Sequence, residues 1–418
     1  MKKFILFILL CHTFLINAQT TANNKQQTSN QIIPGAYRIQ VYLPYLKNKK
    51  VAVFANQTSV IGNTHLVDTL QKLGVNIVKI FSPEHGFRGA VDAGESVESY
   101  IDKQTGIKVI SLYGKKLKPS VEDLNDVDIL IFDIQDVGVR FYTYISSLQN
   151  FIEAAVENSK PLFILDRPNP NGFYVDGPVL DTAYKSFVGM QPVPVVYGMT
   201  IGEYAMMIAG ENWLSKKANE RYNYYRTAKA TADTPIHFVV IKCANYTHKN
   251  KYVLPVKPSP NLPFVSSVYW YPSTCFFEGT IISEGRGTEK PFEIFGHPKL
   301  PDSLYKFIPH STEGAKDPKF KDQICYGWNI SNETPSNKIE LQWLLNAYKL
   351  FPDKDSFFIK PKSNNPKNYF FNKLSGNDEL MLQIIEGKSE KEIRESWQPK
   401  LDTFKKIRKK YLLYPDFE

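Results

Sequence analysis

Carboxylates, arginines, tyrosines and one histidine gather in a few short polar segments of this sequence. Glu84 and His85 are adjacent and lie just before Arg88, and the segment 283–289 packs two acids and an arginine into seven residues. In a carboxylate pair, one group can give a proton to a leaving oxygen while the other activates water or stabilises positive charge on carbon. Such pairs point to cleavage of a glycosidic bond. The candidate catalytic residues are Glu84, His85, Glu284 and Asp133.

Other side chains in the same segments could recognise a substrate. An arginine presents a planar fork that matches a carboxylate, and tyrosine rings suit the faces of sugars. The candidate substrate-binding residues are Asn56, Arg88, Arg140, Tyr142, Asp166, Arg167, Arg286 and Glu289. We expect no metal ion and no cofactor, because His65 and His297 stand alone and no zinc-ligand spacing occurs.

Motifs of other chemistries are mostly missing. The sequence holds no G-x-S-x-G, H-E-x-x-H, G-x-x-x-x-G-K or G-x-G-x-x-G motif. One S-x-x-K match begins at Ser303, as in serine esterases or transpeptidases, but no K-T-G motif accompanies it. A dinucleotide is therefore not expected, and a serine esterase or transpeptidase acting through Ser303 is a further alternative.

Regularly spaced apolar runs must position these polar segments. β-Branched runs are followed by polar residues, with helical patterns over 66–73 and 142–156 between some of them. Strands that alternate with helices predict a Rossmann-like α/β fold with a mainly parallel sheet, whose carboxyl-end loops meet at one edge. The predicted strands are 51–55, 76–81, 108–112, 129–134, 161–165 and 237–243.

The second half of the chain follows a different pattern. A proline-rich stretch over 254–263 predicts a boundary between a Rossmann-like catalytic domain, 34–255, and a smaller mixed α+β domain, 256–418, that completes the cleft. Thr200 and Glu203 have the spacing of a capping box at the start of a helix over 199–214. Two amphipathic helices are predicted near 378–386 and 390–410.

Composition and the first residues bound the class of protein. The 418 residues are 43% hydrophobic and 22% charged, which excludes a disordered or fibrous chain. The net charge of +9 is spread along the chain, which favours an anionic ligand over nucleic acid. Lys2 and Lys3 precede an apolar run over 4–16, and Ala18 offers a cleavage point. We predict a signal peptide over 1–18, a flexible leader over 19–33, and a periplasmic or secreted product with no transmembrane segment.

Three cysteines remain after the predicted signal peptide: Cys243, Cys275 and Cys325. At most one intrachain pair could form among three thiols. We expect small core residues, since free cysteines are among the most buried residue types.

Several long motifs occur in a fixed order from about residue 34 to the C-terminus. They include Phe-Ala-Asn-Gln-Thr-Ser (54–59), Ser-Pro-Glu-His-Gly-Phe-Arg-Gly (82–89) and Asp-Ala-Gly-Glu (92–95). Further motifs begin at 133, 166, 176 and 283, the last reading Ser-Glu-Gly-Arg-Gly-Thr. Together they resemble the exo-β-N-acetylmuramidase (NamZ) family, long described as a domain of unknown function.

The resemblance implies a Rossmann-like domain, a smaller C-terminal domain and an active site in the cleft between them. It also implies release of single N-acetylmuramic acid units from non-reducing ends of peptide-free peptidoglycan glycans built of MurNAc and GlcNAc. Glu84 of the Pro-Glu-His-Gly motif is then the first candidate for the essential carboxylate. Glu284, Asp133 and Glu289 are candidates for the second, unless the substrate's own 2-acetamido group replaces it. The alternative is a non-catalytic periplasmic protein that binds muramyl glycans.

Overall fold

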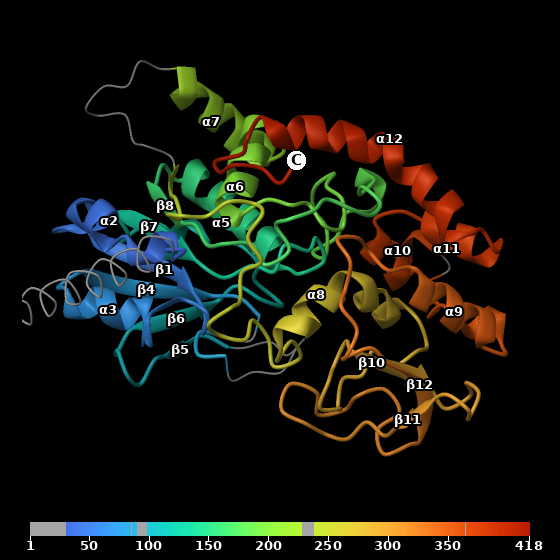
Figure 1. Ribbon diagram of the computed structural model, residues 1–418. Coiled ribbons are helices and arrows are strands. Elements are labelled where there is room, and N and C mark those ends of the chain that lie inside the picture. The colour runs from blue at the N-terminus through green and yellow to red at the C-terminus, as the bar shows by residue number, and fades with distance from the viewer. Residues whose placement is uncertain (1–30, 85, 90–97, 228–237, 364) are drawn as a thin grey trace, which may run out of the picture.

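A seven-stranded sheet forms the first half of the molecule (Figure 1). The computed structural model describes residues 31–84, 86–89, 98–227, 238–363 and 365–418. The strand order is β5-β6-β4-β1-β7-β8-β9, and every neighbouring pair is parallel except β5 and β6 at one edge. The predicted α/β fold is therefore confirmed. The strands are β1 (Lys50–Ala55), β4 (Asn76–Ser82), β5 (Tyr100–Ile101), β6 (Lys108–Ser111), β7 (Ile129–Asp133), β8 (Leu162–Leu165) and β9 (Phe238–Ile241).

Helices cover both faces of this sheet, which is why its strands are nearly continuous apolar runs. Phe54 of β1 packs in one core with residues of α5 and α6, whereas its neighbour Val53 packs in a second core with α2 and α3. Alternate side chains of a strand point to opposite faces, so one strand serves both cores. These helices are α2 (Ile39–Leu46), α3 (Leu66–Lys72), α5 (Tyr144–Glu157) and α6 (Ile201–Gly210), while α4 (Val121–Leu124) and α7 (Lys216–Thr227) complete this half.

The predicted cap of α6 is present. The backbone N–H of Thr200 donates to Oε2 of Glu203 at 2.9 Å, and the Glu203 N–H donates to the Thr200 hydroxyl. This reciprocal pair satisfies two N–H groups that a helix start leaves without partners.

The strand order reverses next to β1. The chain runs from β1 to β4 and β6 on one side, then crosses to β7, β8 and β9 on the other. Ligands of open parallel sheets bind outside the carboxyl ends of strands at such a reversal. The reversal falls between β1 and β7, so the loops after these two strands are the expected floor of a site.

The second half is a mixed α+β assembly around a small antiparallel sheet of order β10-β12-β11. This half lies beside the first sheet, with α9, α10 and α11 on the side away from that sheet (Figure 1). Its elements are α8 (Val265–Thr274), the 3-10 helix η3 (Cys275–Gly279), β10 (Ile294–His297), β11 (Tyr305–Phe307), β12 (Cys325–Asn329), α9 (Gln342–Leu350), α10 (Phe370–Ser375), α11 (Glu379–Ile385) and α12 (Glu390–Lys409). The short elements are η1 (Gly35–Tyr37), η2 (Thr182–Tyr184), η4 (Lys354–Ser356), η5 (Pro366–Asn368) and the β2–β3 hairpin (Val60–Ile61 and Thr64–His65).

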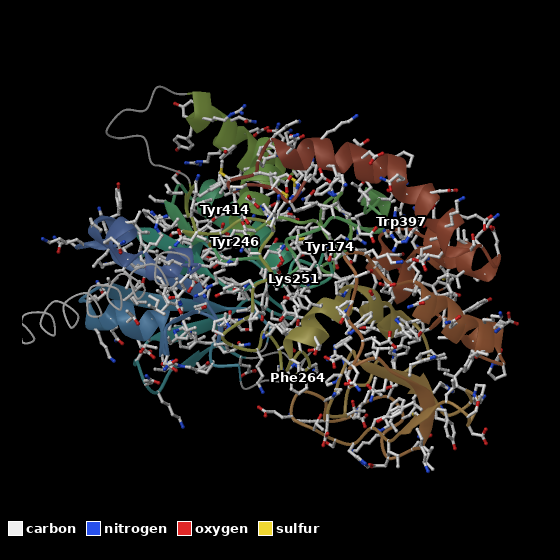
Figure 2. All side chains as sticks on the ribbon, in the orientation of Figure 1. Tyr174, Tyr246, Lys251, Phe264, Trp397 and Tyr414 are labelled. Atoms are coloured by element: carbon white, nitrogen blue, oxygen red, sulfur yellow. The ribbon has the colours of Figure 1, made fainter. Side chains whose placement is uncertain are left out.

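The last helix ties the two halves together. Figure 1 shows α12 running from beside α11 back toward α6, and Figure 2 marks Trp397 on it and Tyr414 beyond it. Arg408 is buried and donates to the Gly198 carbonyl and to Asp416. Tyr414 donates to Oδ2 of Asp166 at 2.5 Å, directly after β8. The chain end thus fixes the second half against the first sheet.

The described residues bear on the predictions for the three cysteines and for membrane spans. Cys243, Cys275 and Cys325 are free and buried, as expected of core residues. Within the described ranges, no helix combines the length and apolar character needed to cross a membrane. The predicted signal peptide and most of the leader lie outside the described residues.

Candidate active site

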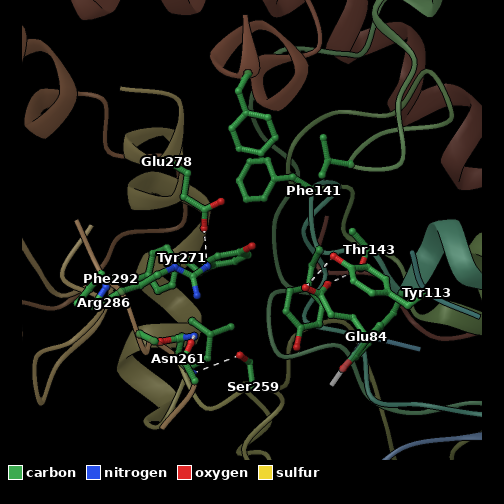
Figure 3. Close-up of a pocket in the computed structure, with 18 of the residues that line it drawn as sticks. Glu84, Tyr113, Phe141, Thr143, Ser259, Asn261, Tyr271, Glu278, Arg286 and Phe292 are labelled. Carbon is green, nitrogen blue, oxygen red and sulfur yellow. Dashed lines mark hydrogen bonds and ion pairs between the residues drawn. The ribbon is translucent and has the colours of Figure 1, made fainter. Parts of the chain in front are cut away.

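A cavity of about 580 Å³ opens where the sheet's carboxyl edge meets the second half of the chain. Loops after β4, β6 and β7 form one wall, and η3 with the segments 259–262, 286–292 and 314–318 forms the other. Figure 3 shows the labelled Glu84, Tyr113 and Thr143 on one side and Glu278, Arg286 and Tyr271 on the other. The volume is that of a pocket for a small ligand.

Glu84 lies on the sheet-side wall, two residues after β4 ends. Tyr113, which follows β6, donates its hydroxyl to Oε1 of Glu84 at 3.0 Å, and Thr143 Oγ1 lies 3.5 Å from Oε2. Burial, with the Glu84 charge beside it, holds the pKa of Tyr113 well above the usual range, so this phenol stays a donor. Two hydroxyls from neighbouring loops therefore orient the carboxylate.

Tyr142 and Tyr144 form the base of the same wall, and their rings meet edge to face at 4.7 Å. Tyr142 donates to the Pro258 carbonyl at 2.9 Å, and Tyr144 accepts a hydrogen bond from the Asn56 amide at 2.8 Å. Burial raises the pKa of both phenols above the usual range. Asn56 thus lies behind the cavity and positions Tyr144.

Glu278 and Arg286 lie together on the opposite wall. The Nη2 of Arg286 donates to Oε1 of Glu278 at 2.8 Å, and the guanidinium lies over the Phe292 ring at 5.1 Å. Arg286 Nε also lies 3.2 Å from Oε1 of the buried Glu284. Burial opposes the charge of Arg286, but the two carboxylates outweigh it and raise its pKa above the usual range.

Glu284 holds this wall from behind. Its Oε2 lies 3.1 Å from Nζ of Lys319, which also donates to three backbone carbonyls. Burial opposes ionisation of Glu284, yet Lys319 and Arg286 hold its pKa below the usual range. Gly285 follows with φ +80°, and a Cβ there would lie 2.0 Å from the Ile294 carbonyl oxygen. The Glu-Gly-Arg sequence thus turns Glu284 inward while its neighbour Arg286 reaches the cavity.

The described residues hold no group of three or more His, Cys, Asp or Glu side chains that could bind a metal ion. The cavity walls offer carboxylates, hydroxyls, one guanidinium and aromatic faces. This set can donate and accept protons at a bound sugar and can pair with a ligand carboxylate.

Comparison with known proteins covers almost the whole chain. Residues 51–266 match the family model of the exo-β-N-acetylmuramidase NamZ N-terminal domain, and residues 269–414 match that of its C-terminal domain. The chain belongs to the NamZ family. The resemblance inferred from the motifs is therefore confirmed.

Relatives within the NamZ family support this placement. The peptidoglycan β-N-acetylmuramidase NamZ of Bacillus subtilis is 37% identical over 417 residues, which cover 95% of this chain and 93% of that protein. Two crystal structures of DUF1343 family proteins from Bacteroides fragilis share the fold. One is 44% identical with a TM-score of 0.80, and the other is 29% identical with a TM-score of 0.74. Each match covers 92% of this chain and 99% of the other.

The NamZ motifs do not all reach the cavity. Of the candidate site residues, Glu84, Tyr142 and Arg286 line it, whereas His85 lies outside the described residues. Glu284 is buried behind the wall, and Glu289 is exposed and does not line the cavity. Glu284 and Glu289, two of the three candidates for the second carboxylate, therefore do not reach the cavity.

Asp133 was a candidate catalytic residue and Arg167 a candidate substrate-binding residue, but the two side chains pair with each other. Arg167 Nε and Nη2 donate to the two carboxylate oxygens of Asp133 at 2.6 and 2.8 Å, and both side chains are buried. Asp166 is buried as well, and it accepts hydrogen bonds from Thr200, Gly202 and Tyr414. These groups do not line the cavity and serve the packing of the sheet edge.

Two predicted arginines also lie elsewhere. Arg140 is fully buried and donates to the carbonyls of Pro178, Val193 and Leu374. Burial lowers its pKa to about 9, because no described carboxylate pairs with it. Arg88 pairs with Asp68 and Asp102 at 3.1 and 3.0 Å, outside the cavity.

Glu278 is the main residue that the sequence analysis missed. It is an isolated acid within the apolar run Cys275-Phe-Phe-Glu-Gly, and that contrast was the available signal. Tyr113 was visible as the first residue past a predicted strand. Other polar or tyrosine side chains of the cavity that were missed include Thr143, Ser259, Asn261, Tyr271, Lys316 and Asp317.

Proposed function

We propose that this chain is an exo-acting glycoside hydrolase that releases N-acetylmuramic acid from non-reducing ends of peptide-free peptidoglycan glycans. The observation that carries the proposal is the pair of carboxylates, Glu84 and Glu278, on opposite walls of one cavity (Figure 3). Most glycoside hydrolases use two carboxyl groups that flank the scissile bond. The Bacillus subtilis relative is named a peptidoglycan β-N-acetylmuramidase, which agrees with the proposal.

Glu84 is assigned the proton transfer to the leaving oxygen. Tyr113 and Thr143 fix the direction of its carboxylate, and a general acid or base must hold its proton within hydrogen-bond reach of the reacting atom. Glu278, held by Arg286, is assigned the stabilisation of positive charge that develops at the sugar ring or on the 2-acetamido group.

The second wall also explains selection of a muramic acid unit. The lactyl group that distinguishes it from N-acetylglucosamine is a carboxylate. Arg286 and Lys316 both line the cavity, and a guanidinium can bind a carboxylate through two parallel hydrogen bonds. Tyr271 and Phe292 add ring faces that can cover the apolar face of a sugar.

Export of the protein is part of the proposal. A basic start, an apolar run over 4–16 and Ala18 at a cleavage point are typical of a secretory signal peptide, and a periplasmic or secreted enzyme would meet its wall substrate directly. Mass spectrometry of the protein recovered outside the cytoplasm should find Gln19 at its N-terminus. An N-terminus that retains Lys2 and Lys3 would contradict this.

The deciding experiment compares 4-nitrophenyl β-N-acetylmuramide with the matching β-N-acetylglucosaminide, with and without a chelator. We expect 4-nitrophenol from the muramide alone, at a rate the chelator does not change. Turnover of both substrates at equal rates would refute recognition of the lactyl carboxylate. Folded protein that binds muramyl glycans but turns over neither those glycans nor the chromogenic substrate would instead identify a binding protein.

A further inference from the structure

A second concave surface adjoins the cavity. It has a volume of about 780 Å³ and is lined by the segment 115–118, by residues of α5, by 185–187 with 190–191, and by 213–215. We refer to this surface as the lysine groove.

The groove and the cavity share a wall. Tyr113 lines the cavity and Lys115, two residues later, lines the groove, while Val188 lines the cavity and its neighbour Phe187 lines the groove. The rings of Tyr113 and Phe187 lie 6.3 Å apart. Because Tyr113 also donates to Glu84, the groove lies on the Glu84 side of the cavity, opposite Arg286.

Among the described residues, only two of the four lysines that line the groove pair with an acidic side chain. Lys116 pairs with Asp123, and Lys118 pairs with Glu153 and Glu157. The exposed side chains of Lys115 and Lys185 form no ion pair with any described residue. Two cations without a counter-charge therefore remain at the rim, which favours an anionic ligand.

The floor of the groove suits a sugar. Phe187 and Trp213 offer apolar ring surface, and the half-buried Asn150 adds an amide that can donate and accept hydrogen bonds. Binding sites of this kind combine apolar and aromatic walls with a few polar groups. A ligand with apolar faces, hydroxyls and a carboxylate would match the ring surfaces, the polar groups and the two lysines of the groove.

We propose that the lysine groove is a subsite for the glycan on the leaving-group side of the scissile bond. This rests on the proposed function. Muramic acid alternates with N-acetylglucosamine in the wall glycan, so after cleavage of the first unit the next lactyl carboxylate lies on the second sugar past the bond. Lys115 and Lys185 bind that carboxylate, while Glu84, on the same side, protonates the leaving oxygen.

The test compares a short and a long substrate in one double variant, Lys115→Gln/Lys185→Gln. Turnover of 4-nitrophenyl β-N-acetylmuramide, which lacks the second sugar, should match the wild type. The KM for a peptide-free glycan of several disaccharides should rise about 3- to 10-fold, as expected from two exposed ionic contacts. The difference should shrink at high ionic strength. The matched control is Lys47→Gln/Lys49→Gln, which removes two exposed lysines just before β1, at the opposite edge of the sheet.

The outcomes separate the two proposals. A glycan KM that rises only in the groove variant, with an unchanged chromogenic rate, supports the subsite. An unchanged glycan KM in a variant that still turns over both substrates overturns the subsite and leaves the proposed function standing. A wild-type protein that turns over neither substrate overturns the proposed function, and the subsite with it.

Discussion

Arg286 donates its Nη2 hydrogen to Oε1 of Glu278 at 2.8 Å, and both side chains line the cavity. The same guanidinium is held from behind by the buried Glu284, through Nε at 3.2 Å. One arginine is thus fixed between a structural carboxylate and one that faces the substrate space. Glu278, unlike Glu284, is therefore exposed to a ligand in the cavity, which is why we assign it the second role in the proposed mechanism.

Glu84→Gln should lower kcat on the chromogenic muramide about 10²-fold or more, because an amide cannot transfer a proton at that position. Circular dichroism and the thermal midpoint should match the wild type, since glutamine keeps the hydrogen bond from Tyr113. The control is Glu98→Gln, an exposed acid outside the cavity, which should keep full activity. A folded Glu84→Gln protein with wild-type kcat would remove Glu84 from the mechanism.

Glu278→Gln should also lower kcat about 10²-fold, because the charge facing the sugar ring is lost. Glu289→Gln makes the same chemical change on an exposed residue that does not line the cavity, and it should leave kcat unchanged. Steady-state kinetics on the chromogenic muramide measure both. If kcat falls only in the Glu289 variant, Glu289, one of the candidates from the sequence, would be the second carboxylate instead of Glu278.

Arg286→Gln should weaken binding of free N-acetylmuramic acid more than binding of N-acetylglucosamine. Loss of a charged hydrogen bond of about 1.5–3 kcal/mol corresponds to roughly a 10- to 150-fold rise in the inhibition constant of the muramic sugar alone. Competitive inhibition by the two sugars gives the comparison, with the exposed Arg226→Gln on α7 as control. Equal weakening of both sugars would show that Arg286 does not read the lactyl group.

Asp133→Asn should destabilise the fold without a specific loss of catalysis. Breaking a buried pair leaves the Arg167 charge without compensation, which costs about 3–5 kcal/mol. Asp133→Asn/Arg167→Gln removes both charges and should lose less stability than the single variant. Urea unfolding measures both. A stable single variant with a 10²-fold lower kcat would instead give Asp133 a catalytic role.

Asp136 should make stability depend on pH. Burial raises the pKa of this carboxyl to about 6, although Tyr197 and the Gly138 N–H donate to it. Its unfolded value is near 3.9, so between about pH 4 and pH 6 the folded chain holds a proton that the unfolded chain has lost. Its contribution to stability is therefore complete below about pH 4 and is lost as pH rises through 6.

Asp136→Asn removes this titration. Relative to the variant, the wild-type free energy of unfolding should fall by about 2 kcal/mol from pH 4 to pH 6.5. Urea unfolding at several pH values measures the difference. Parallel pH profiles for the two proteins would mean that Asp136 keeps an ordinary pKa.

Local sequence determined the scaffold and the edge at which the site lies. Apolar β-branched runs give the strands, and the Thr200–Glu203 spacing gives a helix start, because both depend on neighbours a few residues apart. The rule that parallel strands present their carboxyl ends together was enough to bring the loops of Glu84, Tyr113 and Tyr142 to one wall. Arg286, chosen from its glycine-flanked motif, also lines the cavity.

Only the tertiary structure decided which acids and arginines face the substrate space. Asp133 is paired by Arg167, 34 residues away, and Arg140 is enclosed by carbonyls from Pro178, Val193 and Leu374. Glu278 reaches the cavity because η3 packs against α10, nearly a hundred residues later. A buried charge takes whichever partner the fold brings to it, since burial without a partner is costly, and such long-range pairing leaves no trace in residue spacing.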